Sequence, residues 1–148
     1  MAVSWDGETV GEQEITEDTS RTINHTSAGA NRVAVVGLAL NQSATVTAPT
    51  YGGVSCTQMA TVTFEGHLAR MWYYVAPATG STAVVIAFST SDTYGYWGVT
   101  TYQDTDQSTV YQNGATATGN ASPATVNVSS SNPYSRNAVS IFSALPEV

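Results

Sequence analysis

The sequence predicts an all-β fold: a two-sheet antiparallel β-sandwich of the jelly-roll kind with an N-terminal arm. Short runs rich in Val, Thr, Ile and aromatic residues recur along the chain, and clusters of Gly, Pro, Asn and Ser separate them. No run places apolar residues at the helical spacing of 3.6. With 148 residues, the chain corresponds to one domain that can bury a core without a disulfide or a metal.

The predicted strands follow one another from residue 21. A weakly alternating run at 22–26 leads through a turn to residues 32–40, which are apolar at nearly every position. A run without a polar face predicts a central strand that is buried on both sides. Residues 46–51 contain Pro49, which has no amide hydrogen to donate to a sheet, so this strand is expected at an edge or a bend.

The second half of the chain predicts six strands, separated by turns and by one polar stretch at 104–122. Residues 54–64 alternate apolar residues with Thr, which predicts a single strand there. A turn at 65–66 joins it to a strand rich in aromatic residues. The six strands are expected at 54–64, 67–75, 82–88, 94–102, 124–129 and 137–145.

Charge is scarce and unevenly placed along the chain. Charged residues make up 10%, the net charge is −7, and six of the eleven acidic residues precede residue 20. We therefore expect an acidic N-terminal arm at 1–20 and a β-sandwich domain at 21–148. The basic residues are four Arg without a basic stripe, so nucleic-acid binding is not expected. A surface built from 16 Ser and 22 Thr with few charges favours association between copies.

The chain shows no pattern typical of a catalytic, metal or cofactor site. His25 and His67 have no Cys, Asp or Glu nearby at the spacing of a zinc site. There is no Gly-x-Ser-x-Gly frame for a nucleophile and no Gly-rich phosphate loop. The single Cys56 is expected as a buried apolar residue, and the Asp104-Thr105-Asp106 segment as a solvated turn rather than part of a calcium loop. We also find no signal peptide and no apolar stretch of membrane-spanning length.

Aromatic residues are the candidate binding residues of this sequence. Side chains alternate between the two faces of a strand, so Tyr94, Tyr96 and Tyr102 are expected on one face and Trp97 on the other. Trp5 is expected to anchor the arm against this domain or a neighbour. Outward Tyr and Trp side chains can build a subunit interface or stack on sugar rings, and the remaining interpretation is a core face with scattered surface Tyr. The candidate interface or glycan-stacking residues are Trp5, Tyr94, Tyr96, Trp97 and Tyr102.

Four segments in a fixed order resemble one family of β-sandwich domains. The segments hold Asn-Arg before an apolar strand, then Tyr-Gly-Gly, then Trp-Tyr with Pro-x-x-Gly, and finally a Tyr ahead of an Asp-Gln turn. The family occurs in bacteriophage structural genes and in large secreted bacterial surface proteins, and the resemblance covers residues 20–130. It departs from the family at 103–105, where Gln-Asp-Thr replaces Ser-Gly-Val, and the family's domains continue with further strands. The four segments are 29–37, 51–54, 71–81 and 101–108.

The resemblance implies a virion protein without catalytic residues. A chain that begins with Met and has no export signal fits a subunit that is made in the host cytoplasm and assembled into a virion. We expect a non-enzymatic capsid decoration (cement) protein that binds the major capsid protein or another virion protein and forms a homo-oligomer, with a trimer favoured. Residues 1–20 are expected to order on the shell, so their removal would abolish shell binding and leave the fold intact. The alternatives are a carbohydrate-binding or adhesion module of a tail or fibre that binds host-surface glycans, and a self-assembling tail subunit.

Overall fold

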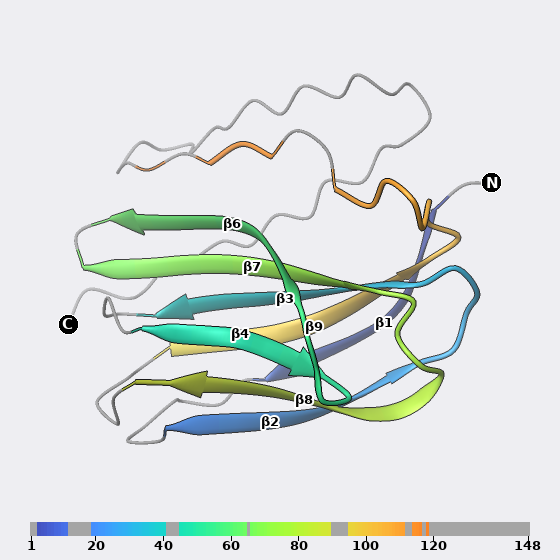
Figure 1. Cartoon of the computed structure of the whole chain (residues 1–148), viewed down its shortest axis with the longest axis horizontal. Helices are drawn as coiled ribbons and strands as arrows, with labels where there is room; N and C mark the ends of the chain where they lie inside the picture. Colours follow the sequence, from blue (N-terminus) through green and yellow to red (C-terminus); the bar gives the residue numbers. More distant parts are fainter. Residues whose placement is uncertain are drawn as a thin grey trace.

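The computed structural model confirms the all-β class and the β-sandwich (Figure 1). Two antiparallel sheets pack against each other, and the described residues contain no helix. One sheet has the strand order β1-β9-β3-β7-β6, and the other has the order β2-β8-β4-β5. The strands are β1 (Ser4–Gly11), β2 (Ser20–Ser27), β3 (Val33–Leu40), β4 (Val46–Tyr51), β5 (Val54–Ser55), β6 (Thr57–Phe64), β7 (His67–Val75), β8 (Gly80–Phe88) and β9 (Gly95–Gln103). The structure describes residues 3–11, 19–40, 45–64, 66–89, 95–111, 114–116 and 118.

Strand β3 lies in the middle of the five-stranded sheet, between β9 and β7. All of its side chains are buried, which confirms the prediction from its uniformly apolar sequence. Its alternate residues belong to the core between the sheets, where Val36 lies opposite Trp72 on β7 and Val99 on β9. Burying an aliphatic side chain of this size stabilises the fold by roughly 1.5–3 kcal/mol, so β3 is a main source of core stability.

The four-stranded sheet follows the simpler alternating pattern. On β2 and β8 every second side chain is buried, and the side chains between them are exposed or half-buried. Ile23 of β2 and Val84 and Ile86 of β8 enter the same core as the apolar residues of β3. This one-sided burial is expected of a sheet that packs on one face and meets water on the other.

The predicted strand at 54–64 is wrong in one respect, because the segment forms two strands in different sheets. Strand β5 belongs to the four-stranded sheet and β6 to the five-stranded sheet, and the chain crosses between them at Cys56. The Cys56 amide donates a hydrogen bond of 2.8 Å to the carbonyl of Pro49. The pairing of β4 with β8 is interrupted between Thr47 and Thr50, which confirms the predicted bend at Pro49. The predicted strands at 124–129 and 137–145 lie outside the described residues.

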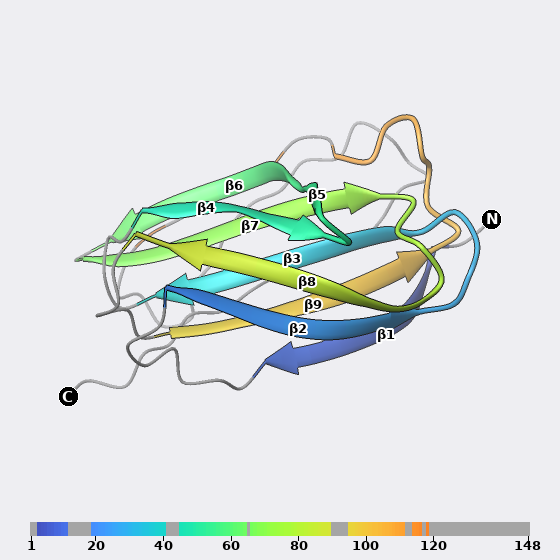
Figure 2. The ribbon, with the colours of Figure 1, turned by 60° about the horizontal axis from the view of Figure 1, so that its bottom comes forward.

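The predicted N-terminal arm is wrong for Ser4–Gly11, which forms β1 of the five-stranded sheet. Strand β1 pairs with β9, and β2 already begins at Ser20, so the boundary expected at residue 20 does not divide an arm from the sandwich. Strands β1 and β2 contact each other at one edge of the sandwich and run side by side there (Figure 2). An edge strand keeps one side toward water and therefore tolerates the acidic residues and glycines that suggested an arm.

Candidate functional site

One end of the sandwich gathers the segments that resemble the β-sandwich family. The Arg32 side chain donates through Nε to the Pro77 carbonyl at 2.9 Å and through Nη1 to the Gly29 carbonyl. The Ala76 amide donates to the Arg32 carbonyl, and the Asp104 amide to the Ala30 carbonyl, each at 2.9 Å. Arg32 thus joins its own loop to the loop at Ala76 and Pro77, and the Ala30 carbonyl joins the same loop to Asp104. These contacts give the shared segments a structural role at this end of the fold.

We expect Arg32→Ala to lower the free energy of unfolding by about 2–3 kcal/mol, because it removes charge-assisted hydrogen bonds to partly buried carbonyls. Arg32→Lys keeps the positive charge but lacks the planar set of donors of the guanidinium group. We expect it to lower the free energy of unfolding by about half as much as Arg32→Ala. Urea unfolding of both variants followed by circular dichroism measures the effect. A loss below about 0.5 kcal/mol in Arg32→Ala, the usual range for surface changes, would contradict this role.

The outer face of the five-stranded sheet carries two of the predicted aromatic residues in exposed positions. Trp5 on β1 is 60% exposed and Tyr96 on β9 is 53% exposed. Trp5 lies directly opposite Tyr102, which is half-buried and shares a face of β9 with Tyr96. Tyr102 lies six positions after Tyr96 along the strand, so the two ends of this aromatic margin are about 20 Å apart. The residues between them on this face of β9, Gly98 and Thr100, are uncharged, whereas the acidic Glu8 of β1 pairs with Thr100.

Trp97 does not belong to this surface. Its side chain is 3% exposed and packs in the core beside Leu38, so it cannot stack on a ligand in the folded protein. The predicted separation of Trp97 from Tyr96 and Tyr102 onto opposite faces of β9 is correct, but the face of Trp97 is the inner one. Tyr94 lies outside the described residues.

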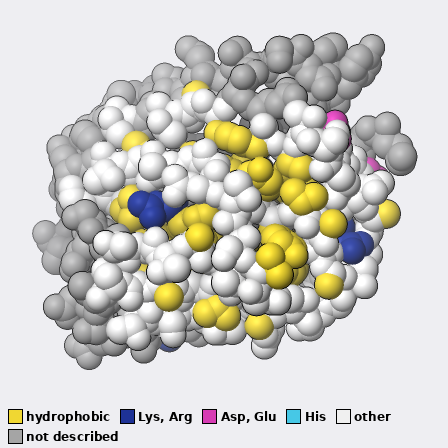
Figure 3. All heavy atoms as spheres, viewed as in Figure 1, with side chains coloured by type: hydrophobic (Ala, Val, Ile, Leu, Met, Phe, Trp, Pro, Cys, Tyr) yellow, Lys and Arg dark blue, Asp and Glu magenta, His cyan; other side chains and the backbone are white. Residues whose placement is uncertain are grey.

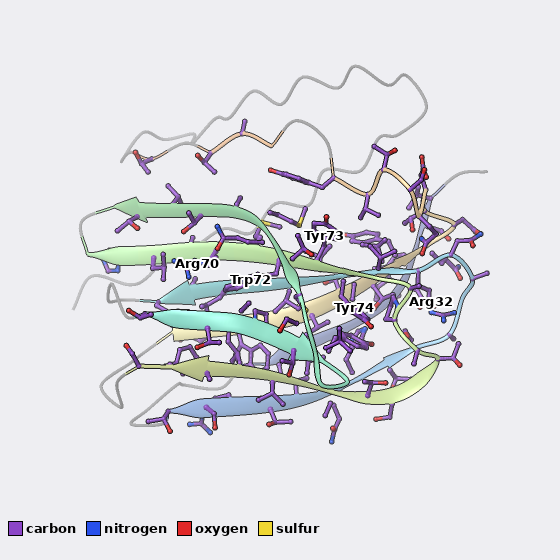
Figure 4. The ribbon with its side chains drawn as sticks, viewed as in Figure 1. Arg32, Arg70, Trp72, Tyr73 and Tyr74 are labelled. Carbon is purple, nitrogen blue, oxygen red and sulfur yellow. The ribbon has the colours of Figure 1, made fainter. Side chains whose placement is uncertain are left out.

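Strand β7 presents its aromatic residues to both sides of the five-stranded sheet (Figure 4). Trp72 is 1% exposed in the core, and Tyr74 stacks on Tyr51 with ring centroids 5.4 Å apart. Tyr73 points to the outer face and stacks on Tyr111, with centroids 6.4 Å apart. The sequence predicted a strand rich in aromatic residues here, but the contact of Tyr73 with Tyr111 could not be predicted because the two residues come from distant segments without a shared pattern.

The view of Figure 3 shows hydrophobic side chains in a band across the middle of this side of the molecule, with arginine side chains toward its two ends. Figure 4 labels Arg70 and Arg32 at these places in the same view. Arg70 donates from Nη1 to the Val46 carbonyl at 3.2 Å and lies 5.8 Å from the centre of the Trp72 ring. Arg70 therefore ties β7 to β4 of the other sheet, and both arginines have structural partners.

A polar group that the sequence did not single out lies inside the sandwich. His25 of β2 and Thr101 of β9 are both 0% exposed, and His25 Nε2 lies 2.5 Å from Thr101 Oγ1. The ring of His25 meets the edge of Tyr51, with centroids 6.2 Å apart. Burial lowers the pKa of His25 below its ordinary value, and the negative charge of Asp6 partly opposes this shift. The sequence could not reveal the contact, because 76 residues separate His25 from Thr101.

Two further residues considered in the sequence, Cys56 and Asp106, have structural roles. Cys56 is buried, as predicted, and burial raises the pKa of its thiol to about 11. The carboxylate of Asp106 accepts hydrogen bonds from the Ser108 amide and hydroxyl at 2.8 and 2.7 Å, which is the geometry of a local turn. Across the described ranges, no group of three or more His, Cys, Asp or Glu side chains could hold a metal ion. Nor does any helix of membrane-spanning length occur there.

Comparison with known proteins gives no match: no protein-family model and no curated protein is similar to this chain. The candidate site therefore rests on the exposed aromatic margin of β1 and β9, whose described members are Trp5, Tyr96 and Tyr102.

Proposed function

We propose that this chain is a non-enzymatic bacteriophage virion protein, a capsid decoration protein that binds the shell through the aromatic margin of Trp5, Tyr96 and Tyr102. The observation that carries the proposal is the exposure of two large aromatic side chains, Trp5 and Tyr96, on one face of a sheet. Tyr and Trp are enriched in protein interfaces and supply much of their binding energy. The resemblance of the four sequence segments to domains of bacteriophage structural genes supports the virion setting.

The lack of charge in the part of the margin that β9 provides agrees with binding to protein. The chain has a net charge of −7, but the outer row of β9 from Tyr96 to Tyr102 has no charged side chain. Charged residues are depleted at the centres of protein interfaces because burying them without partners is costly. An acidic protein can therefore present this uncharged row of β9 to a shell or to another copy, while Glu8 of β1, which pairs with Thr100, brings one negative charge to the same edge of the sheet.

We expect the double variant Trp5→Ala with Tyr96→Ala to bind purified shells that lack this protein at least tenfold more weakly than the wild type. Removing two interface aromatics costs about 1–2 kcal/mol of binding free energy each when they lie in the contact. Co-sedimentation with the shells measures the affinity. Val54→Ala is the control, because Val54 is 53% exposed on β5 in the other sheet. Failure of the wild type to co-sediment, or equal binding by the double variant, would refute the proposal.

A glycan-binding role is the second candidate, because the exposed ring of Trp5 lies opposite Tyr102 on the same face. In this role the protein would be an adhesion module of a tail or fibre. Titration with host-surface glycans would change the tryptophan emission of the wild type and leave that of Trp5→Phe unchanged. Light scattering over a range of concentrations separates both roles from a self-assembling tail subunit, since only the latter grows into polymers without a shell.

A further inference from the structure

The outer face of β3, which points away from the second sheet, is buried as well as the inner face. Every second residue of β3 packs in the core between the sheets: Ala34, Val36, Leu38 and Leu40. The residues between them point outward, and of these Val33 is 4% exposed while Val35 and Ala39 are each 5% exposed. A sheet face that meets water does not bury its side chains to this degree, which indicates a cover over this face.

The central strand of the other sheet provides a comparison. Strand β8 lies between β2 and β4, as β3 lies between β9 and β7. Its outward residues are Ala83, which is exposed, and Val85 and Ala87, which are half-buried. Because the outward residues of both strands include valine and alanine, their composition does not account for the difference. The lower exposure on β3 therefore points to an additional layer over the five-stranded sheet.

Small residues keep the middle of this outer face low. Gly37 of β3 lies directly opposite Gly98 of β9, and Ala39 lies opposite Ala69 of β7. Small residues at such positions let another backbone approach a sheet closely. The outward positions of β9, β3 and β7 at 96–102, 33–39 and 69–75 carry no charged residue. The face is therefore a shallow, uncharged floor that accepts an apolar segment.

The chain that follows β9 turns onto this face. The Asp104 amide donates to the Ala30 carbonyl at 2.9 Å, and Tyr111 stacks on Tyr73 with ring centroids 6.4 Å apart. Tyr73 belongs to the outward row of β7, and β3 lies between β9 and β7. The chain thus passes from β9 to the far side of β3, and residues 112–148 continue from there.

Residues 124–129 match the outer face of β3 in pattern and in length. Apolar and polar residues alternate in this segment, so in an extended chain Ala124, Val126 and Val128 share one face. Six extended residues span about 20 Å, which is also the length of the outward row of β3. The other strand predicted in this part of the sequence, 137–145, has apolar residues on both faces, which is typical of a strand inside a sheet.

We propose that residues 124–129 pack on the outer face of β3 as a third layer, with their apolar side chains against it. The segment is uncharged, as the floor is, so the contact buries apolar surface without burying an ion. Tyr96 lies opposite Ala39 and is 53% exposed, so the aromatic margin stays outside the contact. This inference concerns the fold and does not depend on the proposed function.

Methyl nuclear magnetic resonance of the full chain tests the contact directly. The outer face of β3 offers the methyl groups of Val35 and Ala39. We expect nuclear Overhauser effects to them from the methyl groups of Val126 and Val128. A sample that mixes labelled with unlabelled chains shows whether these effects arise within one chain or between two. The proposal is overturned if the effects come from residues 137–145, if they arise only between chains, or if they are absent.

Two double variants of the full chain give a matched comparison. Val126→Asp with Val128→Asp places charges on the inner face of the segment and should release it. The fluorescence of a dye that binds exposed apolar surface should then rise roughly threefold or more. Thr125→Asp with Asn127→Asp adds the same two charges at the alternate positions and should leave the fluorescence at the wild-type value.

Both double variants are first checked for folding by circular dichroism. Equal dye fluorescence of the two folded variants would contradict the contact. If the variant with charges on the inner face does not fold, the methyl contacts of the wild type still decide whether the segment covers β3.

Discussion

A chain that lacks residues 1–11 is expected to lose about 4 kcal/mol or more of its free energy of unfolding. The deletion removes β1, which pairs with β9 from Ser4 to Gly11, and it uncovers the buried ring of His25. Each lost main-chain hydrogen bond costs roughly 0.5–1.5 kcal/mol, and domains of this size are stable by only about 5–15 kcal/mol. This result is the opposite of the expectation from the sequence, in which removal of residues 1–20 leaves the fold intact.

Urea unfolding followed by circular dichroism measures this loss, with a chain that lacks residues 1–3 as the control. The control deletion ends before β1 begins at Ser4 and should change stability by less than about 0.5 kcal/mol. Equal stability of the two shortened chains would show that β1 contributes nothing to the sandwich in solution.

Trp72→Ala is expected to cost about 3–5 kcal/mol, the range for replacing a large buried aromatic residue by alanine. Trp72 is 1% exposed and lies opposite Val36, so the substitution leaves a cavity at the centre of the core. The stacking of Arg70 on the indole is lost at the same time. Stability measured by urea unfolding should fall to the point where part of the protein is unfolded at 37 °C.

Trp5→Ala provides the matched control for the core substitution. The same chemical change at a side chain that is 60% exposed should alter stability by less than about 0.5 kcal/mol. The two tryptophans therefore separate a structural role from a binding role: Trp72→Ala should affect unfolding, and Trp5→Ala should affect only association. Similar stability losses in the two variants would contradict the assignment of Trp5 to the surface.

The parts of the fold that could be predicted from the sequence are those that a local pattern determines. The apolar run of β3 specifies a strand buried on both sides, because a surface helix or a half-buried strand would carry a polar face and this run has none. The alternation on β9 likewise separates Trp97 from Tyr96 and Tyr102. The pattern alone does not say which face is inside, since both carry aromatic residues. That choice depends on the opposite sheet, which only the tertiary structure supplies.

Three features could not be predicted, because they depend on where strands lie in the fold rather than on a local pattern of residues. The alternation of residues 54–64 continues through Cys56, so the sequence does not mark the point where the chain leaves one sheet for the other. In β1, acidic residues and glycines outweigh the strand signal, although an edge position accommodates both. The contact of His25 with Thr101 joins residues too far apart for any spacing argument.

The pairing of the first described strand with the last has a consequence for synthesis on the ribosome. The partner of β1 is β9, which ends at Gln103, so β1 leaves the ribosome long before its partner exists. At roughly 5–20 residues per second, translating the intervening chain takes about 5–20 s. Throughout that time β1 has no sheet to join, and its acidic residues and glycines keep it soluble and slow to pair with other nascent chains. The acidic residues and glycines of β1, which suggested an arm, thus limit its association with other chains until β9 has been synthesised.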